Sequence, residues 1–221
     1  MKHKVVLVHG YFKNEKDMFT LKSKLEKAAF KVITINLPLT FKKLKSTLPL
    51  FKREIEKIIS ESDAAEKIHF VGHSTGGLLI RRFLAVTEDK DRIGRIVLIA
   101  APNKGSKLAA FARKYFKPLT DVFKTLSSIE SDNVKRLELA AAEDFEMAAI
   151  AGNNCNLILG RLLGKENDGR IRVESVEIPK LKEFVVLPYG HKDIHYQEQT
   201  ANLVANFLEH GNFSGVESSE N

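Results

Sequence analysis

The sequence has little cysteine and no long hydrophobic run. Cys155 is its only cysteine, which excludes an intrachain disulfide and a zinc site built from cysteines. No apolar run approaches the ~18 residues that a membrane-spanning helix needs. The apolar run near the start, Val5 to Val8, is too short to form the core of a secretory signal peptide. These absences favour a reduced, soluble, cytoplasmic protein.

The composition is that of a folded protein with a sizeable core. Of its 221 residues, 43% are hydrophobic, which excludes intrinsic disorder, collagen-like repeats and low-complexity architectures. A chain of this length buries ~70% of the surface that it exposes when unfolded. We expect a single domain over residues 1–210. The last stretch, residues 211–221, is rich in Gly, Ser and Glu and is expected to be a disordered tail.

Positive charge exceeds negative charge, with 35 Lys and Arg against 28 Asp and Glu and a net charge of +7. Such a balance is compatible with nucleic acid or an anionic membrane surface as a partner. The lysines, however, are spread along predicted helices, and no basic stripe interleaved with aromatic residues accompanies them. We therefore expect no nucleic-acid partner and at most a weak contact with anionic membranes. The oligomeric state stays open.

Runs rich in β-branched residues alternate with helical patterns along the chain. Strands are predicted at residues 5–8, 31–35, 67–71, 95–100, 145–151 and 184–187, and helices at 16–30, 47–60, 77–86 and 196–209. This alternation predicts an α/β fold, with an open, mostly parallel six-stranded sheet and helices on both faces. Such sheets carry their chemistry at the carboxyl ends of the strands.

One segment, residues 107–142, interrupts the alternation. It is predicted to be helical with an apolar stripe from Leu108 to Ile129, and Pro118 is expected to divide it into two helices. Two interpretations stay open. The segment could be an ordinary amphipathic layer on the core. It could also be a cap-like insertion over an acyl-binding cleft, because it leaves the sheet just after the fourth predicted strand.

The motif Gly72-His73-Ser74-Thr75-Gly76 matches G-x-S-x-G, the nucleophile elbow. The motif needs small residues two before and two after the serine because a tight strand-to-helix turn leaves no room for side chains. Its three fixed positions occur by chance in roughly one chain in 13 of this size. Context strengthens it, since a β run precedes the motif and a helical pattern follows. We predict that Ser74 is a nucleophile.

Several motifs of the chain resemble those of a known protein family. Three motifs are similar to the lipase and inositol-deacylase-like branch of the α/β-hydrolases: Val6-Leu-Val-His-Gly10, Gly72-His-Ser-Thr-Gly-Gly77 and Ala101-Pro-Asn-Lys-Gly-Ser106. The stretches Asn167-Asp-Gly169 and Val173-Glu-Ser175, and His191, resemble its C-terminal half. The resemblance extends from about Val5 to Leu208. It implies an α/β-hydrolase fold, trimmed to six strands because no room exists for the two that usually come first. No motif of the family matches residues 107–142.

A nucleophilic serine needs a base to take its proton and an acid to orient that base, and the expected chain order is Ser, Asp or Glu, then His. His3, His9, His69 and His73 have the wrong order, and His210 lies past the last helix. His191 is favoured because it follows the sixth predicted strand after a Pro188-Tyr189-Gly190 turn. The alternative, His195, is expected to cap or flank the final helix.

For the acid, Asp168 is favoured because it lies in a loop between Ser74 and His191 in the chain. It could also be a simple turn residue, since Asn-Asp-Gly forms turns in any protein. Asp193 is expected to cap the following helix, and Asp144 lies at the wrong end of the fifth predicted strand.

The oxyanion of an ester intermediate needs backbone donors, and we expect the N–H groups of Thr75 and Tyr11, with Phe12 as the alternative to Tyr11. His9 is expected to shape the first loop. A cluster of His191, Asp193 and His195 is the metal alternative, but we predict no metal and no cofactor.

The predicted function is a serine hydrolase that cleaves carboxylic esters through an acyl-enzyme on Ser74. The resemblance implies lipase-like or esterase-like activity on a small-molecule or lipid-like ester. The apolar stripe favours a moderately hydrophobic acyl chain. The same residues would also serve a thioesterase or an acyltransferase. A non-catalytic binding module on a hydrolase fold is the rival outside enzymes, and the intact Ser, Asp, His order argues against it.

Overall fold

The computed structural model describes residues 3–110, 124–155, 160, 163–164 and 166–215. Its centre is a six-stranded sheet of order β2-β1-β3-β4-β5-β6. The strands are β1 (Lys4–Val8), β2 (Lys31–Ile35), β3 (Ile68–His73), β4 (Ile93–Ile99), β5 (Met147–Gly152) and β6 (Glu183–Leu187). Every pairing between these strands is parallel, so their carboxyl ends meet at one edge. The predicted α/β fold with a six-stranded parallel sheet is confirmed.

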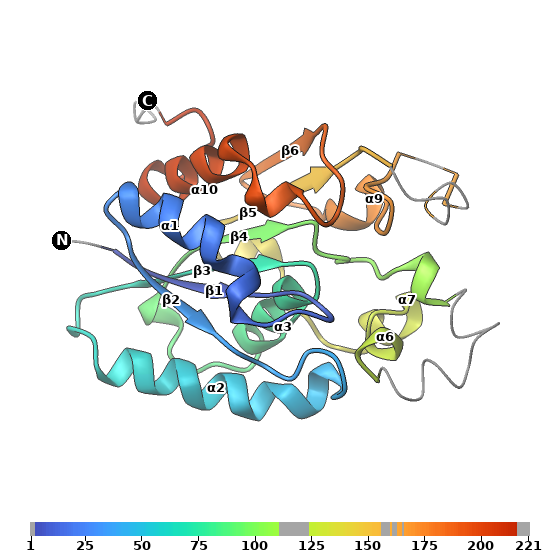
Figure 1. The fold of residues 1–221 in the computed structure, drawn as a ribbon. Coiled ribbons are helices and arrows are strands. Elements are labelled where there is room, and N and C mark those ends of the chain that lie inside the picture. Colours follow the sequence, from blue (N-terminus) through green and yellow to red (C-terminus); the bar gives the residue numbers. More distant parts are fainter. Residues whose placement is uncertain (1–2, 111–123, 156–159, 161–162, 165, 216–221) are drawn as a thin grey trace.

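Helices cover both faces of this sheet (Figure 1). The helices α1 (Phe19–Lys27) and α10 (Glu198–His210) cover one face, and α2 (Leu44–Ser60) and α3 (Thr75–Leu84) cover the other. Successive side chains of β1 point to opposite faces, so Val5 and Leu7 join one buried cluster while Val6 and Val8 join the other. Burial on both faces explains why the strands are almost continuously apolar in the sequence.

Several helices differ from their predicted bounds. The first expected helix is split into the 3₁₀ turn η1 (Glu15–Met18) and α1, and Ala29, with a φ of 68°, follows α1 in a left-handed conformation. The helix α2 begins three residues earlier than predicted, because Leu44 is buried and its N–H donates to the Ser128 hydroxyl over 3.3 Å. The 3₁₀ turns η2 (Lys90–Arg92) and η4 (Ile194–Tyr196) precede β4 and α10.

The segment 107–142 is only partly helical. Its described part contains α6 (Lys124–Ser128) and α7 (Ser131–Lys135), which lie with α9 (Val173–Val176) beyond the edge where the strands end (Figure 1). The expectation of helix up to residue 142 was wrong, because the chain is not helical between α7 and the 3₁₀ turn η3 (Ala142–Asp144). The reason is tertiary: the Ala140 N–H donates to the Arg81 carbonyl over 3.1 Å, which ties the segment to α3. Pro118 and the middle of the stripe lie outside the described residues, whereas Ile129 packs into the core.

The chain remains packed for a short distance after α10. Gly211, with a φ of 80°, ends the helix in the left-handed conformation that glycine adopts without strain. Phe213 then folds back onto Phe207, with ring centroids 5.7 Å apart, although we expected this stretch to belong to the tail. Residues 216–221 lie outside the described part. None of the described helices has the length and apolar character needed to cross a membrane.

Candidate active site

Ser74 lies in a strained turn between β3 and α3. Its φ of 53° and ψ of −122° are a conformation that residues other than glycine rarely adopt. The Ser74 N–H donates to the Ile99 carbonyl over 2.8 Å, which holds the turn to the end of β4. This geometry, with the helix starting at the next residue, is that of a nucleophile elbow.

The glycines of the motif allow this turn to form. A Cβ atom added to Gly72 would lie 2.6 Å from the Gly77 Cα, and one added to Gly76 would lie 2.6 Å from the His9 carbonyl oxygen. Both neighbours are main chain and cannot move aside. The close packing of β1, β3 and α3 at this point therefore requires glycine on both sides of the serine.

The structure brings Ser74, Asp168 and His191 together in a hydrogen-bonded chain. The Nε2 atom of His191 is 3.0 Å from the Ser74 Oγ, and its Nδ1 is 2.7 Å from the Asp168 Oδ2. All three side chains are buried. Because the Asp168 carboxylate can only accept, Nδ1 carries the imidazole proton, and Nε2 faces the hydroxyl with a lone pair. This arrangement can remove the proton from Ser74 when its oxygen attacks an electrophile.

Asp168 is both a turn residue and the partner of His191. Its Oδ1 accepts the N–H groups of Arg170 and Ile171 over 2.9 and 2.7 Å, and its carbonyl accepts the His191 N–H over 2.9 Å. Gly169 completes the turn with a φ of 93°. The two interpretations of Asn-Asp-Gly in the sequence are therefore compatible, because one carboxylate oxygen holds the turn and the other faces the imidazole.

The alternatives considered from the sequence lie elsewhere. Asp193 is exposed and precedes η4 without a side-chain capping bond. Asp144 is exposed in η3, before β5 begins. His195 is fully buried, and its Nε2 lies 3.1 Å from the Asp17 Oδ2.

The loop after β1 packs directly against the serine. A Cβ atom added to Gly10 would lie 3.0 Å from the Ser74 Cβ, so the loop that continues into Tyr11 and Phe12 begins beside the elbow. His9 shapes this loop: its Nε2 accepts the Leu37 N–H over 3.1 Å, so its Nδ1 carries the proton and donates to the Gly10 carbonyl over 2.9 Å. Burial lowers the pKa of His9, in keeping with a neutral structural ring.

Thr75, on the other side of the serine, is the first residue of α3 and is fully buried. The N–H groups at a helix start point away from the helix and favour a negative charge in front of them. Thr75 thus lies where a backbone donor could face an oxyanion on a substrate bound to Ser74.

Sequence reasoning missed a second buried group, which lies behind His191. The Oδ1 of Asp17 accepts hydrogen bonds from the Lys13 Nζ over 2.6 Å and the Tyr196 Oη over 2.5 Å, and its Oδ2 faces His195. Burial would raise the pKa of Asp17, but the close contact with His195 and the hydrogen bonds from Lys13 and Tyr196 outweigh it and hold that pKa well below its usual range. No spacing in the sequence signals this group, because η1 and η4 are far apart in the chain.

The ring of His73 connects this group to His191. It stacks on the ring of His195 with centroids 4.0 Å apart, and its Nε2 donates to the His191 carbonyl over 3.0 Å. Burial lowers the pKa of His73 well below its usual value, so the ring is neutral. We call Asp17, His73 and His195 the rear cluster.

Among the described residues, the rear cluster is the one set of three with donor atoms close enough to suggest a metal site, within 4.8 Å of one another. It differs from the metal alternative considered from the sequence, which combined His191, Asp193 and His195. The interplanar angle of 23° between the stacked rings prevents both from directing an in-plane nitrogen at one ion. Lys13 and Tyr196 already donate to the carboxylate. Among the described residues, hydrogen bonds hold the Asp17 Oδ1 and the His73 Nε2, whereas the Asp17 Oδ2, the His73 Nδ1 and both ring nitrogens of His195 are buried without a hydrogen-bond partner.

Comparison with known proteins assigns the family. Residues 1–113, just over half of the chain, match the family described as "Putative serine esterase (DUF676)". The chain belongs to this family. The part matched by the DUF676 family contains Ser74 and both expected oxyanion donors, whereas Asp168 and His191 lie beyond it. None of the curated protein sequences matches the chain.

Solved structures show the fold. Lipase BlEst2 from Bacillus licheniformis, in its mature form, has a TM-score of 0.81 at 18% identity, over 96% of this DUF676 chain and 92% of that one. Phospholipase PlaB from Legionella pneumophila has a TM-score of 0.76 at 14% identity, over 97% and 61%. A thermophilic esterase from Thermogutta terrifontis has a TM-score of 0.61 at 15% identity, over 96% and 91%. At these identities the likeness shows the α/β-hydrolase fold.

Proposed function

We propose that this protein hydrolyses carboxylic esters through an acyl-enzyme on Ser74. The observation that carries the proposal is the hydrogen-bonded chain from the Ser74 Oγ through His191 to Asp168. A serine hydroxyl attacks a carbonyl only when a base removes its proton, and the unprotonated Nε2 of His191 is within reach to do so. Membership of a serine esterase family supports the same chemistry.

The reaction proceeds in two halves. The Ser74 Oγ forms a bond to the acyl carbon as its proton passes to His191, and Asp168 stabilises the imidazolium that results. The oxyanion accepts hydrogen bonds from the Thr75 and Tyr11 N–H groups, with Phe12 as the alternative donor. His191 then gives its proton to the departing alkoxide. Water, activated by the same imidazole, releases the carboxylic acid from Ser74, and no cofactor takes part.

The substrate proposed is a small-molecule or lipid-like ester with a moderately hydrophobic acyl chain. The lipase and the phospholipase among the similar folds support this class. A series of p-nitrophenyl esters of increasing chain length measures it, and we expect kcat/KM to rise from the acetate to medium chains. Turnover confined to the shortest chains would contradict the hydrophobic acyl chain. A preference for thioesters, or for an added alcohol over water as acceptor, would redirect the proposal to a thioesterase or an acyltransferase.

Labelling with a fluorophosphonate probe tests the nucleophile and the base together. We expect the wild-type protein to be labelled, the variants Ser74→Ala and His191→Ala to remain unlabelled, and His195→Ala to be labelled. The His195 variant tests the alternative base, because this histidine is buried nearby but faces Asp17 rather than Ser74. Failure of the folded wild-type protein to react would contradict a catalytic role and favour a non-catalytic binding module.

The net charge of +7 supports a further proposal, a weak contact with anionic membrane surfaces. Sedimentation with anionic and neutral vesicles measures it. We expect binding to anionic vesicles only, and its loss as salt is raised, because exposed charges are screened beyond about 10 Å at 0.1 M salt. Binding that does not respond to salt, or no binding, would contradict this contact.

A further inference from the structure

A pocket lies on the α3 side of the sheet, away from Ser74, Asp168 and His191, which we call the triad. Its volume is about 440 Å³, within the range of small-molecule sites. The segment from α7 to η3, the loop after β4 and the chain after α9 line it. None of the triad residues belongs to its lining. It includes Asn103 and Lys104 of the Ala101–Ser106 motif, for which the proposed mechanism has no use.

The arginine in this pocket has no negatively charged partner among the residues that the structure describes. Arg81 is only 7% exposed. Its Nε and Nη2 donate to the Ala140 carbonyl over 3.1 and 2.7 Å, and its Nη1 donates to the Asn103 Oδ1 over 3.1 Å. These acceptors are neutral, and in the described part of the chain no carboxylate forms an ion pair with the guanidinium. Burial lowers the pKa of Arg81 to about 10, which still leaves it charged at neutral pH.

An unpaired buried cation is costly, and this one keeps capacity for a ligand. A guanidinium has five N–H groups, and the hydrogen bonds of Arg81 use three of them. Asn103 fixes its orientation, because the Asn103 Nδ2 donates to the Val176 carbonyl over 2.7 Å while its Oδ1 accepts from Arg81. The free-energy cost of burying the guanidinium is lower when an anion pairs with it.

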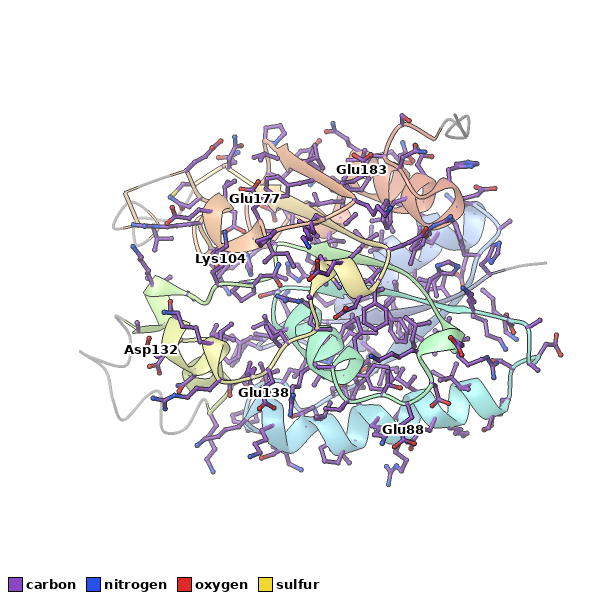
Figure 2. The ribbon with its side chains drawn as sticks, turned by 180° about the vertical axis from the view of Figure 1, so that it is seen from behind. Glu88, Lys104, Asp132, Glu138, Glu177 and Glu183 are labelled. Atoms are coloured by element: carbon purple, nitrogen blue, oxygen red, sulfur yellow. The ribbon has the colours of Figure 1, made fainter. Side chains whose placement is uncertain are left out.

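The rest of the lining is apolar inside and basic at the rim. Val134, Leu139 and Ile178 form apolar walls. Lys104 and Lys135 are exposed at the rim and form no ion pair within the described residues, while Lys180 pairs with Glu143. Lys104 is labelled in Figure 2, with three carboxylates that do not line the pocket: Asp132, Glu138 and Glu177. The lining thus holds four cations and one carboxylate.

We propose that this pocket binds a small anionic amphiphile, an alkyl carboxylate whose head group meets Arg81 and whose chain lies on the apolar walls. A bidentate contact between guanidinium and carboxylate suits the two remaining N–H groups. The rim lysines attract the head group, and the walls select a molecule with an apolar chain over a bare anion. The proposal does not rest on the proposed function, because the pocket and the triad share no residue.

Calorimetric titration with dodecanoate at submicellar concentration tests the proposal, with dodecanol and inorganic phosphate as comparison ligands. We expect saturable binding of dodecanoate, at least tenfold weaker binding of dodecanol and no measurable binding of phosphate. The double variant Lys104→Glu/Lys135→Glu should weaken dodecanoate binding at least tenfold without unfolding the protein, because both side chains are exposed. The matched control is Lys31→Glu/Lys90→Glu, which makes the same change of charge at two exposed residues, the start of β2 and η2, outside the lining of the pocket.

Three results would overturn the proposal. Equal affinity for dodecanoate and dodecanol would show that the charge of Arg81 plays no part. Phosphate binding as tightly as dodecanoate would show that the apolar walls play none. An effect of Lys31→Glu/Lys90→Glu as large as that of the rim variant would assign the attraction to net charge. Arg81→Gln should abolish dodecanoate binding. Because Arg81 also donates to the Ala140 carbonyl, this variant could fail to fold, and the rim variant then provides the test.

Discussion

At the scale of single residues, the proposed chemistry depends on main-chain geometry around one serine. Ser74 is held at a positive φ between two elements that approach so closely that only glycine fits beside it. The strain of this conformation is tolerated because β3, β4 and α3 all fix the chain on either side. Its consequence is that the hydroxyl lies at the carboxyl edge of the sheet, within reach of His191.

The first prediction concerns Gly76. The variant Gly76→Ala places a Cβ 2.6 Å from the His9 carbonyl oxygen, so α3 or β1 must shift. We expect the free energy of unfolding to fall by about 2 kcal/mol or more, with loss of esterase activity. Urea denaturation measures the change. Gly190→Ala is the control, because its nearest new contact, the Asn154 carbonyl oxygen at 3.4 Å, is ordinary. Equal stability of the two variants would contradict the steric argument.

The second prediction concerns Asp168. In Asp168→Asn, the remaining side-chain oxygen can still accept hydrogen bonds from the N–H groups of Arg170 and Ile171. The new NH₂ group faces the Nδ1 of His191 as a donor. The imidazole proton then moves to Nε2, which can no longer accept from Ser74. We expect kcat to fall by a factor on the order of 10⁴, with little change in stability. Steady-state kinetics with a p-nitrophenyl ester measures it, and Asp193→Asn is the control. A fall of less than tenfold would count against Asp168.

At the scale of elements, the rear cluster joins three segments behind the site. Asp17 lies in η1, His73 at the end of β3 and His195 in η4. Tyr196 and Lys13 hold the carboxylate from two sides, and His73 holds the main chain of His191. The loop that carries His191 is therefore braced against the strand that leads into Ser74. We assign the rear cluster a positioning role.

The third prediction tests this role with Asp17→Asn. The change keeps an acceptor for Tyr196 but removes the negative charge that faces His195 and Lys13. We expect the free energy of unfolding to fall by about 2 kcal/mol. We also expect a lower kcat with KM nearly unchanged, because His191 is positioned less well. Asp91→Asn, on the exposed turn η2, is the control. Reduced stability with an unchanged kcat would limit the cluster to a role in folding.

At the scale of the whole molecule, buried histidines make stability depend on pH. Burial lowers the pKa of His69 to about 4 and also lowers those of His9 and His73. In the unfolded chain these rings titrate near pH 6.5. Between about pH 6.5 and pH 4 the unfolded chain binds more protons than the folded one, so stability rises with pH there and is lost as pH falls.

The fourth prediction isolates one of these histidines. In His69→Asn, the amide oxygen can replace the Nδ1 that accepts the Arg95 N–H over 2.8 Å, but it cannot be protonated. We expect the loss of unfolding free energy between pH 7 and pH 5 to be smaller than in the wild type by about 2 kcal/mol. Urea denaturation at both values measures it. His210→Asn removes a histidine from the partly exposed end of α10 and should leave the difference as it is. A wild-type protein equally stable at both pH values would contradict the prediction.

The sequence determined the features that depend on local pattern. Apolar runs that alternate with helical patterns were enough to predict the six strands of the sheet. A strand that is buried on both faces is apolar along its whole length, so it can be recognised within its own segment. Gly72, Ser74 and Gly76 predicted the elbow because its steric demands fall within five residues. The order of Ser74, Asp168 and His191 followed from the resemblance to the α/β-hydrolases and from the loops on which the two partners lie.

Only the tertiary structure decided the features that depend on contacts between distant segments. It placed His191 rather than His195 beside Ser74, and it gave the two carboxylate oxygens of Asp168 different partners, the turn and the imidazole. It ended the helix α7 at Lys135 because Ala140 pairs with Arg81, and it buried that arginine among neutral acceptors. Such contacts leave no periodic trace, since they join main-chain atoms and single polar side chains across long stretches of chain.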